Sequence, residues 1–152
     1  MPGVKVTPIK PAGPVRDIPM GQIAQAVAAA PVDADFEDAA VWSIKLPADL
    51  DLDADPILRI HYVGDVARVT LDGRLLTDDF YNGKAVDIGL RRHAPEILEG
   101  ELRLEILPLQ KSAPIYMAEE ARPDFGQAAS VVSLDGVEII PRRQIQLDAL
   151  RR

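Results

Sequence analysis

The feature that most constrains the fold is a repeated alternation of apolar and polar residues over short runs. A period of two sends successive side chains to opposite faces of a strand, so each run predicts a strand with one buried face. The strands of parallel α/β sheets are instead continuous apolar runs, which this chain lacks. The pattern therefore predicts an all-β fold. The predicted strands lie at 40–46, 56–63, 66–72, 75–81, 86–90, 101–106, 115–117, 131–135 and 137–140, with a short edge strand at 4–7.

Turn signals separate these strands. Asp72-Gly73 and Asn82-Gly83 are dipeptides typical of tight turns, because Asp, Asn and Gly readily adopt positive φ. Gly136 predicts a further break between the last two strands. Short alternating strands at a spacing of about ten residues are typical of a jelly-roll β-sandwich, which is the architecture we predict.

The two ends of the chain depart from this pattern. Four prolines between residues 8 and 19 limit the first segment to an edge strand, since proline has no ladder donor. Met20 to Ala30 carries apolar residues at helical spacing and ends at Pro31, so it is the one short helix we expect. Residues 1–141 are predicted to form one β-sandwich domain. Residues 142–152 are a charged tail, and partial disorder of this tail is one expectation.

Composition narrows the functional classes. The 152 residues carry 24 acidic and 17 basic side chains, a net charge of −7, with no dense basic stripe. This field repels phosphate backbones, so we expect no nucleic-acid partner. The absence of cysteine removes disulfides and thiolate chemistry. The first residues lack the apolar core of a signal peptide, and no apolar run is long enough for a membrane span, so we expect no membrane partner.

An aspartate run raises a calcium hypothesis. Asp51, Asp53 and Asp55 have the spacing of the first three ligands in an EF-hand loop. However, the sixth position is Pro56 instead of glycine, and the twelfth is Tyr62 instead of a bidentate glutamate. The run at residues 33–37 fails the same test. The sequence predicts no local metal site and no cofactor, but a structural calcium held by separate loops stays open.

Catalytic motifs are also missing. There is no Gly-x-Ser-x-Gly elbow for a hydrolase nucleophile and no glycine-rich phosphate loop. His61 and His93 are far apart in sequence, and His61 falls on the polar face of its predicted strand. The carboxylates are too numerous for spacing alone to indicate a glycosidase pair. We nominate no catalytic residue.

One aromatic corner could bind a carbohydrate. Trp42, Tyr62 and Phe80 are in phase with aliphatic neighbours, which predicts that they pack in the core. Tyr81 lies beside the Asn82-Gly83 turn, where a ring could stack against a sugar. The alternative is a structured hairpin corner without a ligand. The candidate carbohydrate-binding residues are Asp79, Tyr81, Asn82 and Lys84.

Several segments together resemble a known family. The string from Tyr62 to Gly83, with 88–90, 104–109 and 113–117, resembles the C-terminal jelly-roll region of bacterial glycoside hydrolases of family 35, the β-galactosidases. The resemblance extends from about Val4 to Ile140. Its most specific pieces are Gly64-Asp65 and the Phe80-to-Gly83 stretch.

The resemblance implies a galactose-binding-like accessory domain without catalytic residues. In that family a separate (β/α)8 barrel carries the chemistry, and the jelly-roll regions either bind glycans or support the barrel. The expected partners are therefore a galactoside or other glycan, and the catalytic barrel of a parent hydrolase. A parent of this kind is usually periplasmic or secreted. The alternative is a structural interdomain module with no ligand.

Overall fold

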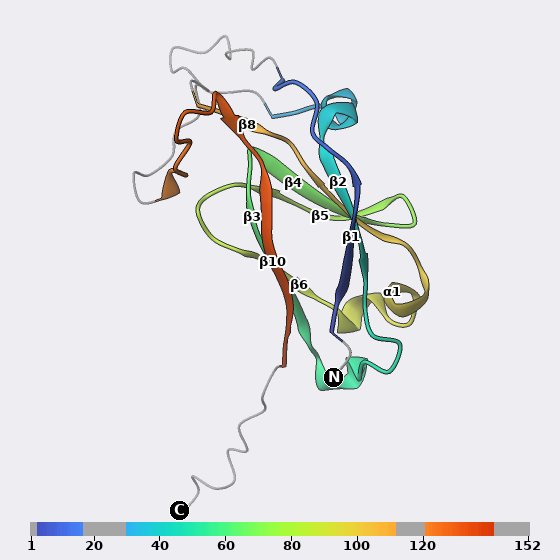
Figure 1. Ribbon diagram of the computed structural model, residues 1–152. Coiled ribbons are helices and arrows are strands. Elements are labelled where there is room, and N and C mark those ends of the chain that lie inside the picture. The colour runs from blue at the N-terminus through green and yellow to red at the C-terminus, as the bar shows by residue number, and fades with distance from the viewer. Residues whose placement is uncertain (1–2, 17–29, 112–120, 142–152) are drawn as a thin grey trace, which may run out of the picture.

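The protein is built mainly of antiparallel strands. The computed structural model describes residues 3–16, 30–111 and 121–141 (Figure 1). The strand order is β1-β2-β7-β4-β5 in a five-stranded sheet and β10-β3-β6 in a three-stranded sheet, with β8 and β9 forming a short pair. The all-β prediction is confirmed. The strands are β1 (Lys5–Lys10), β2 (Ala40–Lys45), β3 (Ile57–Val63), β4 (Val66–Leu71), β5 (Arg74–Phe80), β6 (Val86–Gly89), β7 (Leu102–Ile106), β8 (Leu109–Gln110), β9 (Ser130–Val131) and β10 (Ser133–Ile140).

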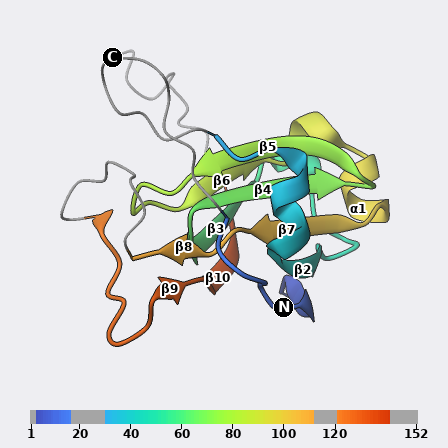
Figure 2. The same ribbon diagram turned by 90° about the horizontal axis from the view of Figure 1, so that it is seen from above.

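The helical segments of the described residues are short and lie in the connections between strands. Figure 2 shows α1 at the end of the molecule away from β8 and β9. The predicted helix at 20–30 falls almost wholly outside the described residues, as do the predicted strand at 115–117 and the tail. The helical segments are η1 (Asp33–Asp38), η2 (Leu52–Ala54), η3 (Arg91–His93) and α1 (Glu96–Glu99).

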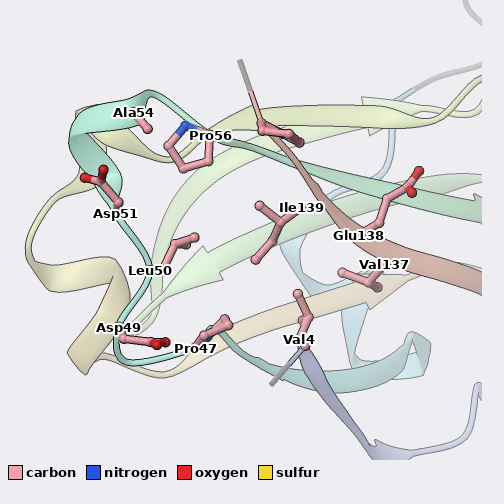
Figure 3. A pocket seen from close by; sticks show the side chains of 12 residues that line it. Val4, Pro47, Asp49, Leu50, Asp51, Ala54, Pro56, Val137, Glu138 and Ile139 are labelled. Carbon is pink, nitrogen blue, oxygen red and sulfur yellow. The ribbon is translucent and has the colours of Figure 1, made fainter. Parts of the chain in front are cut away.

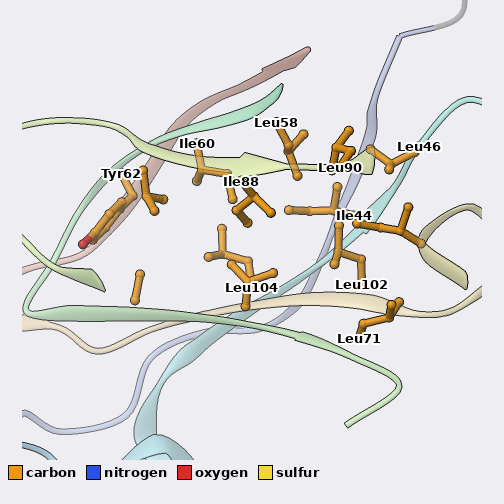
Figure 4. Close-up of a cluster of buried hydrophobic side chains, with 14 of the residues drawn as sticks. Ile44, Leu46, Leu58, Ile60, Tyr62, Leu71, Ile88, Leu90, Leu102 and Leu104 are labelled. Carbon is orange, nitrogen blue, oxygen red and sulfur yellow. The ribbon is translucent and has the colours of Figure 1, made fainter. Parts of the chain in front are cut away.

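The two larger sheets share one apolar core (Figure 4). Leu58 and Ile60 from β3 and Leu104 and Ile106 from β7 are fully buried, at 0% exposure. Their alternation with polar neighbours is the period-two pattern of the sequence, so the inward faces of β3 and β7 were predicted correctly. Burying each such aliphatic side chain contributes about 1.5–3 kcal/mol, which makes this layer the main source of stability.

A smaller cluster covers the outer side of the five-stranded sheet at one end. Phe36 from η1 packs there with Ala39, Val66 and Leu107. The Arg68 guanidinium lies over the Phe36 ring at 3.9 Å, a cation–π contact. This cluster explains why β4 begins with residues buried on both faces.

The first turn forms as predicted, and the second joins two sheets. Asp72 and Gly73 have φ of 49° and 82°, as a two-residue hairpin turn between β4 and β5 requires. Gly83 also has positive φ, 84°. However, β5 and β6 belong to different sheets, so Asn82-Gly83 is a link across the molecule and not a hairpin turn.

Two predictions fail because of β-bulges. The pairing of β4 with β5 shifts between Val69 and Thr70, which leaves Leu76 as an extra residue. The inward phase of β5 then changes, and Phe80, predicted to be in the core, is 55% exposed. A second shift, between Leu134 and Gly136, lets β10 run on through the glycine where the sequence predicted a break.

Candidate functional site

The predicted carbohydrate corner is organised around a buried tyrosine hydroxyl. Tyr62 from β3 reaches across to β5, where its hydroxyl donates a hydrogen bond to the Asp79 carboxylate at 2.6 Å. The Asp79 main-chain oxygen lies 3.0 Å from the same hydroxyl. The Tyr81 ring meets the Tyr62 ring edge-on, with centroids 5.5 Å apart and planes at 71°. Tyr62 thus holds both Asp79 and Tyr81, a role that its core-facing position in the sequence pattern does not predict.

The electrostatics of this corner follow from burial. Burial, reinforced by the hydrogen bond to Asp79, raises the pKa of the Tyr62 hydroxyl far above its ordinary value, so it remains a donor. Burial also raises the pKa of Asp79, and the bond from Tyr62 partly opposes that shift. The pKa of Tyr81 rises through burial and through the nearby Asp135 carboxylate. The pair joins a neutral phenol to a partly desolvated carboxylate.

Asn82 and Lys84 complete the turn. The Asn82 side-chain oxygen accepts the Lys84 main-chain N–H at 3.0 Å. The Tyr81 main-chain N–H donates to the Asp65 carbonyl at 3.0 Å. The structure therefore brings all four predicted residues into one corner, but the Asp79 carboxylate and the Asn82 side-chain oxygen have partners within the fold. Asn82 and Lys84 are exposed at this corner, and Tyr81 is partly exposed.

The neighbouring Gly64-Asp65 pair is a structural support of the same corner. The Asp65 carboxylate lies 2.7 Å from Arg16 Nε, and the two side chains are 4% and 5% exposed. A Cβ at Gly64 would lie 2.8 Å from the Leu107 carbonyl oxygen and still closer to the Ile106 side chain. The Gly64-Asp65 piece of the resemblance therefore has a packing explanation.

A groove opens at the opposite end of β3, between the beginning of β1 and the end of β10 (Figure 3). Its volume is about 690 Å³. In Figure 3 the Leu50, Ile139 and Val4 side chains converge on it. The lining comprises Gly3, Val4, Pro47, Asp49, Leu50, Asp51, Ala54, Pro56, Val137, Glu138, Ile139 and Pro141.

The groove is an open edge of the core. Val137 and Ile139 on β10 pair with Ile60 and Leu58 on β3. The two β3 side chains are fully buried, at 0% exposure, whereas their β10 partners are only half-buried. Both β1 and β10 are edge strands within the described residues, so neither has a second partner there. The groove could not be foreseen from sequence, because it depends on which distant strands end at the edges.

Carboxylates stand around this apolar floor. Asp49 and Asp51 come from the loop between β2 and β3, and Glu138 comes from β10. Asp51 Oδ1 accepts the Asp53 main-chain N–H at 3.1 Å, and Glu138 Oε1 lies 2.9 Å from His61 Nε2. His61 is at the surface, as predicted. The rim is acidic, and two of its carboxylates, Asp51 and Glu138, are held by contacts within the fold.

Neither aspartate run gathers a set of metal ligands. Among the described residues, no group of three or more His, Asp or Glu side chains is placed to hold an ion. In the run at 51–55, Asp51 caps η2 and Asp55 adopts φ of 57° as its C-cap. In the earlier run, Asp35 accepts the Val32 main-chain N–H and Asp33 pairs with Arg68. These carboxylates have local structural roles.

Comparison with known proteins gives no relatives. No family model matches the chain, no curated protein matches it, and no solved structure matches it. Within the described residues, no helix has the length and apolar character needed to cross a membrane. Function must therefore be inferred from the geometry described above.

Proposed function

We propose that this chain is a noncatalytic accessory domain of jelly-roll, galactose-binding-like type, attached to or descended from a β-galactosidase-type glycoside hydrolase. We propose further that it acts by packing against another polypeptide. This role corresponds to the structural interdomain module that the sequence leaves open as an alternative to a sugar binder. The observation that carries it is the half-buried apolar edge at Val137 and Ile139, which belongs to the same layer as the fully buried Leu58 and Ile60.

The lining of the groove supports a protein partner over a sugar. A sugar site needs aromatic faces and several convergent polar groups. The described lining of the groove contains no aromatic residue, and its centre is aliphatic and proline-rich. Covering such a surface with another apolar surface is favourable by about 25 cal/mol per Å² of apolar area removed from water.

Sugar binding at Tyr81 is the second candidate function. The favourable observation is that the edge contact with Tyr62 fixes the Tyr81 ring while leaving it partly exposed beside Lys84. Against it, the Asp79 carboxylate and the Asn82 amide oxygen already have partners in the fold. A ligand at this corner would have to compete with these bonds.

Calorimetric titration separates the two candidates. We expect no saturable heat with galactose, lactose or a β-galactan oligosaccharide up to millimolar concentration, with or without calcium, and no turnover of a nitrophenyl β-galactoside. An apolar fluorescent dye should bind the native domain, and Ile139→Ser should weaken that binding. Ile9→Ser, which changes an exposed apolar residue outside the groove, is the matched control. Saturable sugar heat that disappears in Tyr81→Ala would overturn the assignment in favour of the second candidate.

A further inference from the structure

The groove lies beside an edge strand, in a position that suits the addition of one further β-strand. The three-stranded sheet faces a five-stranded sheet, and β10 is its edge on the groove side. An edge strand presents unpaired main-chain N–H and C=O groups along its length. A strand added beside β10 would extend the smaller sheet and place alternate side chains over the half-buried apolar residues Val137 and Ile139.

The two edges at the groove differ in their capacity to accept a strand. β1 contains Pro8, which has no N–H, and its pairing is irregular between Pro8 and Lys10. The end of β10 is regular: Val137 to Ile140 pair in unbroken register with Ile60 to Ile57. The regular edge is therefore the one suited to main-chain pairing, while Val4 and Leu50 supply the apolar contacts opposite.

The charges around the groove define the occupant further. Asp49 and Asp51 stand at one side, and Glu138 projects from the strand that would be extended. The whole chain also carries a net charge of −7. An acidic segment would be repelled, whereas Lys or Arg side chains would meet complementary charge.

We propose that the groove takes an extended segment of a partner polypeptide, with apolar residues at alternate positions and Lys or Arg at its ends, as a fourth strand beside β10. This rests on the proposed function, because it names the chemistry of the partner that covers the apolar edge. Main-chain hydrogen bonds to β10 supply affinity, and side-chain alternation and charge supply selectivity.

The test is a fluorescence titration of the full chain with a synthetic peptide in which valine and threonine alternate and arginine occupies both ends. We expect one-to-one binding with a dissociation constant on the order of 100 µM. Replacing the arginines by glutamate should weaken binding at least about tenfold. Replacing a central threonine by proline should abolish it, because the main-chain donor is lost.

Variants of the protein locate the site. Asp49→Asn and Glu138→Gln should each weaken binding about two- to fivefold, because each removes one rim charge and keeps the side chain's size. Asp124→Asn, an exposed carboxylate outside the groove, should leave binding unchanged. Ile139→Asp should abolish binding, and retained cooperative unfolding of this variant would show that the loss is local.

Other occupants give different results. Binding seen only after Ile145→Asp and Leu147→Asp are introduced would mean that this chain's own C-terminal residues fill the groove. Concentration-dependent dimerisation lost in Ile139→Asp would mean that a second copy does. Either result overturns the proposal. Dye binding without peptide binding would refute strand addition alone, whereas absence of both would also refute the proposed function.

Discussion

The buried pair of Arg16 and Asp65 should be a principal determinant of stability. The carboxylate lies 2.7 Å from Arg16 Nε, with the two side chains 5% and 4% exposed. Asp65→Ala leaves the guanidinium without this counter-charge in a nearly dry site. Removing one partner of a buried ion pair costs about 3–5 kcal/mol, because water cannot replace the lost opposite charge in a nearly dry site.

A matched control separates the effect of burial on the free energy of unfolding from the effect of ion pairing alone. Asp87 accepts two hydrogen bonds from Arg59, at 2.8 and 2.9 Å, but these side chains are 37% and 41% exposed. Asp87→Ala should therefore cost at most about 1 kcal/mol. The two substitutions remove the same chemical group from an arginine pair and differ chiefly in burial.

Urea unfolding monitored by the single tryptophan, Trp42, provides the assay. With an m-value of about 2 kcal/mol/M, Asp65→Ala should lower the midpoint by about 1.5–2.5 M and Asp87→Ala by at most about 0.5 M. Unchanged m-values would show that the unfolding transition is the same. Equal shifts for the two variants would refute the argument that desolvation decides the cost.

Three further predictions concern the tyrosine corner and its surroundings. Gly64→Ala should cost about 1–3 kcal/mol in urea unfolding, because a Cβ would lie 2.8 Å from a main-chain oxygen, whereas Gly89→Ala, with open space around it, should be nearly neutral. Tyr62→Phe should cost about 1–3 kcal/mol because Asp79 loses its hydroxyl donor, and an unchanged midpoint would contradict this. Burial raises the pKa of Asp79, so the native state retains that proton more strongly than the unfolded chain and stability falls as pH rises above the ordinary value of 3.8. Asp79→Asn should remove this pH-dependent loss of stability. The melting temperature of the variant minus that of the parent should therefore rise between about pH 3 and pH 7. A difference that falls over this range would contradict a raised Asp79 pKa.

The sequence pattern was sufficient to predict those strands and turns whose conformation depends on neighbouring residues. The alternation in β3, β4 and β7 predicted which side chains face the core, because both faces of these strands are set by one regular period. The turn at Asp72-Gly73 was predicted equally well, since few pairs of adjacent residues adopt positive φ at both positions.

The features that the sequence did not predict depend on a bulge or on contacts between residues far apart in the chain. A single extra residue in β5 reverses the phase of everything after it, so Phe80 moved outward without any local sign. Asp79 became the partner of Tyr62, 17 residues away, for the same reason. The groove depends on the pairing of β10 with β3, which are remote in sequence. The Arg16–Asp65 contact likewise joins residues 49 positions apart.

An amide chemical-shift map of the labelled full chain, recorded with the arginine-ended peptide and with lactose, distinguishes a groove that binds a polypeptide from a corner that binds sugar. We expect the peptide to shift the amides of Val137 to Ile140 and of the loop that carries Leu50, and we expect lactose to shift none. Lactose-induced shifts at Tyr81 to Lys84, with an unperturbed groove, would contradict the account and identify the domain as a sugar binder.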